Sequence, residues 1–145
     1  GYEVTPLRQH LASILGVDRN WRMALIGVGH LGRALLSYSG FENHGFNIVA
    51  AFDTASDEVG QSIGPLVVQP IGDLADTISK RDIRIGIVAV PATQAQDVID
   101  QLVICGVKAI LNYAPVGPQV PNGVRVRNID PILALQSMTY YLKSD

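Results

Sequence analysis

One feature of the sequence constrains the fold more than any other, a G-x-G-x-x-G motif that runs from Gly27 to Gly32. The apolar run Trp21 to Ile26 precedes the motif and is typical of a buried strand. Residues His30 to Tyr38 follow with apolar side chains at helical spacing, and Gly40 stands where we expect this helix to stop. The glycines therefore join a predicted strand to a predicted helix, and this setting makes an otherwise common motif informative.

A second predicted strand, Asn47 to Asp53, ends on an acid 21 residues after Gly32. In a dinucleotide-binding βαβ unit, an acid at this position accepts hydrogen bonds from the adenosine ribose. The glycines would permit a tight turn, the approach of a diphosphate and close helix packing, and the helix N-terminus would supply N–H groups. The charge of Asp53 should repel a 2′-phosphate, and the following residues Thr54 to Ser56 include no Arg or Lys. The pattern therefore favours NAD(H) over NADP(H).

The rest of the chain alternates further apolar runs with helical patterns, which predicts an α/β fold with a doubly wound, mostly parallel Rossmann sheet. The additional predicted strands are 65–68, 84–90, 107–111 and 124–127, and the additional predicted helices are 71–81 and 95–106. Ligands of such sheets lie beyond the carboxyl ends of the strands. We therefore expect the loops 90–93 and 112–115 to line the nicotinamide end of the site.

Both ends of the chain carry helical patterns outside the predicted sheet, which divides the chain into 1–20, 21–128 and 129–145. Residues Thr5 to Gly16 predict a helix that precedes the first Rossmann strand, and this helix should either pack against the Rossmann domain or link it to a segment upstream. Asp130 and Pro131 can begin a second helix over 132–143, which is apolar on most sides. That pattern fits a dimer interface, or docking against a second chain, as well as it fits burial in the domain's own core.

Composition excludes several classes of protein. The 145 residues suffice for one domain, and a net charge of −2 with a pI of about 5.9 gives no nucleic-acid-binding surface. The single Cys105 excludes an internal disulfide and a cysteine metal cluster, and it fits a reducing cytoplasm. No apolar run approaches the roughly 18 residues of a membrane span. We therefore expect a cytoplasmic protein without a metal site.

The residues that usually carry catalysis do not gather in the predicted carboxyl-end loops. These residues are His10, His30, His44, Cys105, Lys80, Lys108 and Lys143. Only His30 is near the predicted ligand, where it would border the diphosphate, and Tyr113 would pack beside the nicotinamide. We therefore expect that this protein is not an enzyme. Two alternatives remain, the nucleotide domain of an NAD-dependent dehydrogenase or reductase, and a CoA-binding domain of similar fold.

Motifs along essentially the whole chain resemble the Rex family of redox-sensing transcriptional repressors. The most discriminating are Tyr38-Ser39-Gly40-Phe41, the segment Asn112 to Pro115, and Ile129-Asp130. The resemblance implies that this chain is the half of a repressor that senses the NADH to NAD+ ratio. It also implies an absent winged-helix domain that binds operator DNA, and a homodimer that exchanges C-terminal helices. Binding of NADH would then release the operator.

The resemblance also implies roles for individual residues. Tyr38 and Asp130 would belong to the switch between two dimer states, with Asp130 reaching across from the partner. The neutral lining of the nicotinamide pocket should favour the uncharged reduced ring over NAD+. The residues expected to bind the cofactor are Gly27, Val28, Gly29, His30, Leu31, Gly32, Asp53, Thr54, Val90, Pro91, Ala92, Tyr113, Ala114 and Pro115.

Overall fold

The computed structural model describes residues 20–129 together with residues 135, 136, 138, 139 and 142. The predicted N-terminal helix and Asp130 lie outside this part of the chain. The elements are β1 (Trp21–Ile26), α2 (His30–Ser37), α3 (Gly40–Asn43), β2 (Phe46–Asp53), β3 (Ser62–Ile63), β4 (Leu66–Pro70), η1 (Ile71–Asp73), α4 (Leu74–Lys80), β5 (Ile85–Val88), α5 (Ala92–Ile104), β6 (Ala109–Asn112) and β7 (Arg125–Asn128).

The seven strands form one sheet in the order β3-β4-β2-β1-β5-β6-β7, and every pair except β3 with β4 is parallel. The predicted doubly wound, mostly parallel sheet is confirmed. From β1 the chain builds outward first through β2 and β4, and then on the other side through β5, β6 and β7. The carboxyl end of β1 is therefore the switch point where sheets of this kind bind ligands.

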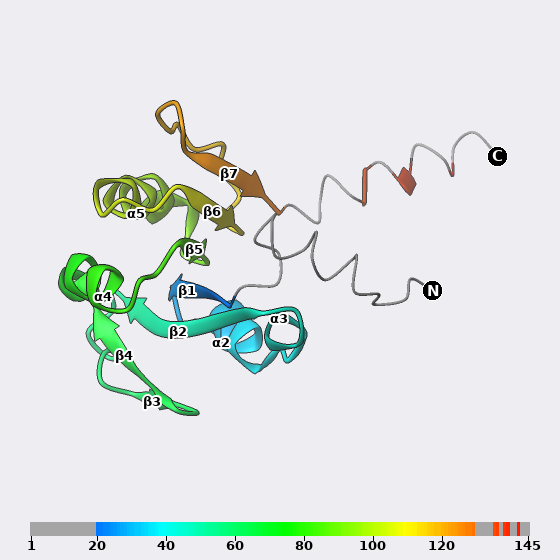
Figure 1. Cartoon of the computed structure of the whole chain (residues 1–145). Coiled ribbons are helices and arrows are strands. Elements are labelled where there is room, and N and C mark those ends of the chain that lie inside the picture. Colours follow the sequence, from blue (N-terminus) through cyan, green and yellow to red (C-terminus); the bar gives the residue numbers. More distant parts are fainter. Residues whose placement is uncertain (1–19, 130–134, 137, 140–141, 143–145) are drawn as a thin grey trace, which may run out of the picture.

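Helices cover both faces of the sheet (Figure 1), because nearly all central-strand side chains are apolar and need cover on each side. The buried residues of α4 and α5, such as Ile78 and Leu102, pack in one core cluster with Ile26 and Phe52 of the sheet. On the other face, Leu35 of α2 packs in a second cluster with the opposite side chains of β1, β2, β4 and β5. Within residues 20–129, α2 and the single turn α3 cover this face.

Two elements were not predicted from the sequence. Strand β3 lies between the predicted strands 47–53 and 65–68, in a segment where no element was predicted, and it pairs with β4 through only two residues. Gly40 was expected to stop the preceding helix, but α2 already ends at Ser37, and Gly40 begins α3. A side chain at Gly40 would overlap the ring of Tyr38 in its present position, so this glycine makes room for the ring and does not terminate the helix.

Gly86 of β5 makes room for Leu102 of α5, because a Cβ on Gly86 would lie 2.8 Å from Leu102 Cδ1. We expect Gly86→Ala to lower the free energy of unfolding by about 1–3 kcal/mol through overpacking, and Leu102→Ala to lower it by about 2–5 kcal/mol. The double variant should lose less than the sum, since the added methyl group fills the vacated space. Denaturant unfolding of the three variants measures this coupling.

Gly72→Ala is the matched control, because a Cβ at Gly72 meets no atom within 4 Å. Its unfolding free energy should stay near that of the parent chain. Strictly additive losses for Gly86→Ala and Leu102→Ala would contradict the account of this helix–sheet contact.

Candidate functional site

Two glycines of the motif are required by the packing of the protein itself. Gly27 has a φ of 103°, which favours glycine, and a Cβ there would overlap the carbonyl of Ala89. Its N–H donates to the Phe52 carbonyl at 2.8 Å, which joins the loop to β2. A Cβ on Gly32 would overlap the Gly27 carbonyl, so Gly32 lets α2 approach β1 closely.

Gly29 differs from these two glycines, because a Cβ at this position would meet no protein atom within 4 Å. Its φ of −68° is available to any residue, so neither strain nor packing within the chain requires a glycine here. Gly29 is the N-cap of α2, and no side chain caps the first-turn N–H groups of that helix. The loop therefore presents open space directly before free backbone donors, an arrangement that suits an anion.

Asp53 ties the end of β2 to the glycine loop. Its Oδ2 accepts the Val28 N–H at 2.9 Å, and its Oδ1 accepts the Ala55 N–H at 2.9 Å. Each carboxylate oxygen has a second lone pair, so both oxygens can still accept a hydrogen bond from a ligand hydroxyl. The exposed Thr54 donates from Oγ1 to Gln94 Oε1 at 3.1 Å, which links this loop to α5.

The two loops predicted at the nicotinamide end follow neighbouring strands and lie beside the glycine loop. The Ala89 N–H donates to the Ile26 carbonyl, and the Tyr113 N–H donates to the Val88 carbonyl, both at 2.8 Å. Val90 and Ala114 are buried, whereas Pro91, Ala92 and Pro115 are exposed. The structure thus brings the glycine loop, Asp53 and both later loops together along one edge of the sheet.

Asn112 shapes the second of these loops, a role that sequence reasoning missed. Its buried side chain accepts the Ala114 N–H at 3.0 Å and donates to the Ala114 carbonyl at 3.1 Å. The same amide donates to Asn128 Oδ1 at 3.0 Å, which joins the end of β6 to the end of β7. The available signal was a polar residue at the end of an apolar strand, where a buried amide must find partners.

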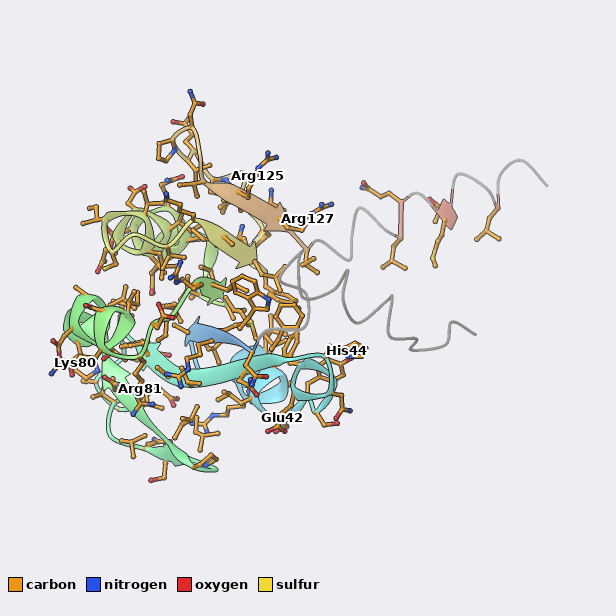
Figure 2. All side chains as sticks on the ribbon, in the orientation of Figure 1. Glu42, His44, Lys80, Arg81, Arg125 and Arg127 are labelled. Atoms are coloured by element: carbon orange, nitrogen blue, oxygen red, sulfur yellow. The ribbon has the colours of Figure 1, made fainter. Side chains whose placement is uncertain are left out.

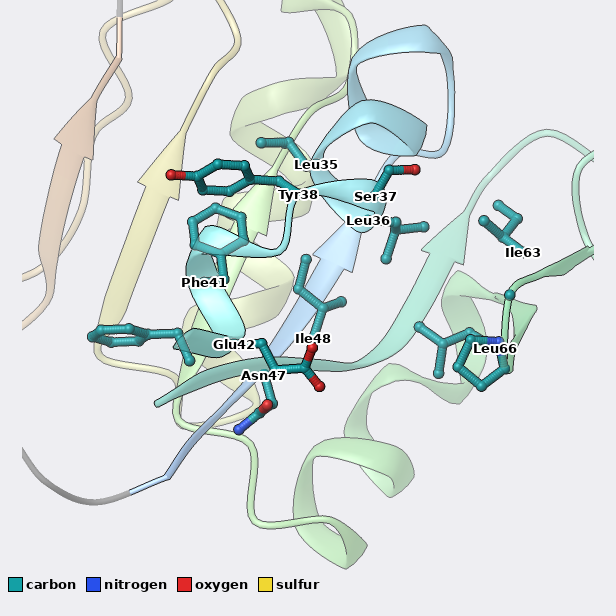
Figure 3. Close-up of a pocket in the computed structure, with 13 residues that line it drawn as sticks. Leu35, Leu36, Ser37, Tyr38, Phe41, Glu42, Asn47, Ile48, Ile63 and Leu66 are labelled. Atoms are coloured by element: carbon teal, nitrogen blue, oxygen red, sulfur yellow. The ribbon is translucent and has the colours of Figure 1, made fainter. Parts of the chain in front are cut away.

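Tyr38 lies at the far end of α2 and packs edge-on against Phe41, with ring centroids 5.0 Å apart. Both rings line a groove of about 400 Å³ that extends to the β3–β4 turn, where Ile63 and Leu66 form its other end (Figure 3). Burial raises the pKa of the Tyr113 phenol above its ordinary value, and the neighbouring Tyr38 phenol raises it further. Tyr113 is therefore neutral at pH 7.

The remaining candidates form no catalytic or metal centre in the described part of the chain. The Nδ1 atom of His44 lies 2.9 Å from the Gly40 carbonyl, and His30 is exposed at the start of α2. Burial raises the pKa of the Cys105 thiol, which disfavours the reactive thiolate. Among the described residues there is no group of three metal-ligating side chains, and no helix long and apolar enough to cross a membrane.

The sequence was compared with protein families and with known proteins. Residues 18–116 match the family described as "CoA binding domain". The chain is 49% identical over 142 residues to the redox-sensing transcriptional repressor Rex of Chloroflexus aurantiacus, covering 98% of this chain and 67% of that protein. It is 48% identical to the Rex repressor of Roseiflexus sp., covering 100% of this chain and 66% of that protein. The chain thus spans about two thirds of the length of these relatives.

Solved structures agree with the sequence comparison. The crystal structure of RSP, a Rex-family repressor, is 35% identical with a TM-score of 0.86, covering 99% of this chain and 69% of that one. The structure of RSP with β-NAD+ and operator DNA has a TM-score of 0.88, covering 99% of this chain and 66% of that one. These relatives are named as repressors, which confirms the expectation that the chain is not an enzyme. The chain belongs to the Rex family of redox-sensing transcriptional repressors.

Proposed function

We propose that this chain is the NAD(H)-sensing and dimerisation part of a repressor, in which NADH binding favours release from operator DNA. RSP, which is 35% identical to this chain over the aligned residues, has been solved with β-NADH and with β-NAD+ and operator DNA. Operator DNA would be bound by a winged-helix domain outside this chain. Residues 1–20 would link that domain to the Rossmann domain 21–128, and the whole repressor would act in the cytoplasm.

The observation that carries this proposal is the open space at Gly29. Gly27 and Gly32 are needed by the protein, but nothing in the described structure requires Gly29 to lack a side chain. A diphosphate on the free N–H groups of α2 would occupy the volume that a Cβ would take. Gly29 is therefore a glycine reserved for the ligand, as expected if the motif from Gly27 to Gly32 holds a dinucleotide.

The other cofactor-binding residues follow from their places around this point. Asp53, with Thr54 beside it, would accept the hydroxyls of the adenosine ribose. The loops Val90 to Ala92 and Tyr113 to Pro115 would enclose the nicotinamide. These side chains are uncharged, and the neutral Tyr113 adds no negative charge, so the site should favour the neutral reduced ring over the cationic NAD+ ring.

Selective binding of NADH can move the repressor between two dimer states only by its differential affinity for them. A 100-fold difference in affinity corresponds to about 2.7 kcal/mol. Tyr38 and the partner's Asp130 would belong to the element that changes between these states. In support of this role, Phe41, which packs against the Tyr38 ring, belongs to the same apolar cluster as Tyr113, and the Tyr38 phenol contributes to the raised pKa of the Tyr113 phenol.

CoA is a second candidate ligand, favoured by the family that residues 18–116 match. CoA carries a phosphate on its adenosine ribose, where NAD(H) carries only hydroxyls. The Asp53 carboxylate would repel that phosphate, while its free lone pairs suit hydroxyl donors. The geometry at Asp53 therefore favours NAD(H).

An apolar hollow that no helix of residues 20–129 fills supports the proposed homodimer. On the α2 side of the sheet, this hollow of about 630 Å³ over β5, β6 and β7 is lined by Met23, Phe41, Ile85 and Leu111, with two arginines of β7 at its margin. Figure 2 shows these arginines, Arg125 and Arg127, on the edge strand. In 129–145, three helical residues spaced along one stripe are exposed, Leu135 by 55%, Met138 by 58% and Leu142 by 70%. We propose that this stripe covers the hollow on a partner subunit.

Replacing Gly29 by Ala should separate ligand binding from folding. We expect Gly29→Ala to leave the melting temperature nearly unchanged and to weaken NADH binding by at least about tenfold, because the new methyl group displaces the diphosphate. Gly32→Ala should lower both quantities, since its Cβ overlaps the Gly27 carbonyl. Thermal unfolding and calorimetric titration give the two readouts. Unchanged NADH affinity in folded Gly29→Ala would contradict the proposed diphosphate position.

Parallel titration with NADH, NAD+ and CoA tests the sensor and the role of Asp53. We expect NADH to bind more tightly than NAD+, and CoA to bind weakly or not at all. Asp53→Asn should weaken both NADH and NAD+ by about tenfold or more, because hydrogen bonds to a charged acceptor are lost. Equal affinity for NADH and NAD+ would make the sensor untenable, and tight CoA binding would favour the second candidate.

The dimer is tested by a charge placed in the exposed stripe. We expect the parent chain to sediment as a dimer at micromolar concentration, and Met138→Glu to sediment as a monomer, because a buried carboxylate would have no partner. Ile104→Glu is the control, since Ile104 is 84% exposed at the end of α5, away from the hollow. A monomeric parent chain, or a dimeric Met138→Glu variant, would rule out this interface.

A further inference from the structure

An arginine on α2 forms an ion pair with the segment that follows Asp53. Arg33 follows Gly32 on α2, and its Nη2 atom pairs with Glu58 Oε2 at 2.7 Å. The same nitrogen donates to Gln61 Oε1 at 2.9 Å. The sequence argument for NAD(H) considered only the residues directly after Asp53, and it therefore missed an arginine that comes from the preceding helix.

A series of local hydrogen bonds connects this ion pair to Asp53. The Asp53 carboxylate holds Val28 N–H on the glycine loop and Ala55 N–H on the following turn. The Glu58 N–H donates to the Ala55 carbonyl at 3.1 Å, so Glu58 belongs to the turn that Asp53 anchors. Arg33 lies one helical turn beyond the loop that holds Val28. The Arg33–Glu58 pair is therefore connected through local hydrogen bonds to the carboxylate that would hold the adenosine ribose.

A free arginine beside this ribose would alter the choice of cofactor. NADP(H) differs from NAD(H) by a phosphate on the 2′ oxygen of that ribose, and a guanidinium is the side chain best suited to bind a phosphate. In the structure, Glu58 neutralises Arg33, and Gln61 occupies a further donor position. The Asp53 charge then acts on the 2′ oxygen without a free cation to offset it.

We propose that Glu58, assisted by Gln61, determines the selectivity for NAD(H) by holding Arg33 away from the 2′ oxygen. This inference rests on the proposed binding of NAD(H) by the same site. The Arg33 and Glu58 side chains are 39% and 27% exposed, so the pair can be reached by a ligand and broken without opening the core. A purely structural role, tying the 54–61 loop to α2, would affect stability but not the ratio of the two cofactor affinities.

The test is the ratio of NADPH to NADH affinity, measured by fluorescence titration of the 145-residue chain. In Glu58→Gln, Arg33 becomes available to the 2′-phosphate, and we expect the ratio to rise by about tenfold or more. Glu58→Ala should raise it in the same direction, which keeps the test valid if one variant folds poorly. The gain should disappear in the Arg33→Gln, Glu58→Gln double variant.

Asp76→Asn is the matched control, because it breaks the exposed Lys80–Asp76 pair on α4 and leaves Arg33 unaffected. Its NADPH to NADH ratio should equal that of the parent chain. An unchanged ratio in folded Glu58→Gln and Glu58→Ala that still bind NADH would overturn the proposal. Failure of the parent chain to bind NADH would instead refute the proposed function, so the two failures are distinguishable.

Discussion

The close approach of Gly32 to the carbonyl of Gly27 is the contact on which the rest of the site depends. It holds α2 against β1 and directs the N-terminus of this helix toward the carboxyl edge of the sheet. The same approach requires the sharp turn at Gly27, where φ is 103°. With these two glycines fixed by packing, Gly29 is left at the helix N-terminus with open space beside it, so one backbone contact creates both the anion site and the room for its ligand.

In the proposed site, Asp53 would extend this arrangement from the diphosphate to the ribose. A carboxylate at the end of β2 could adopt several orientations in water, but the Val28 and Ala55 N–H groups fix both of its oxygens. The turn that begins at Ala55 then brings Glu58 to Arg33. The carboxylate that would contact the ribose, and the ion pair proposed to select against a 2′-phosphate, are thus connected by one chain of local hydrogen bonds. On the other side of β1, the Asn112 side chain fixes the loop that would hold the nicotinamide, through two hydrogen bonds to Ala114.

The sequence predicted the parts of the fold that depend on local pattern. The strand before Gly27, the helix after it and the acid at Asp53 follow from residue spacing alone, and the buried parallel strands follow from continuous apolar runs. The role of Gly40 was misinterpreted because it depends on the position of the Tyr38 ring, which lies over this glycine and which the sequence pattern does not reveal. Strand β3 was missed because a two-residue strand in a polar segment carries no periodic signal. Arg33 and Glu58 are 25 residues apart, and no local pattern predicts their pairing.

The most direct test of the account is a crystal structure of this chain with NADH bound. The account predicts diphosphate oxygens over Gly29, within hydrogen-bonding distance of the first N–H groups of α2, and the adenosine ribose hydroxyls on the Asp53 carboxylate. The nicotinamide should lie between the loops 90–92 and 113–115. A cofactor bound elsewhere, or one whose diphosphate does not contact the glycine loop, would contradict the central claim that Gly29 is reserved for the ligand.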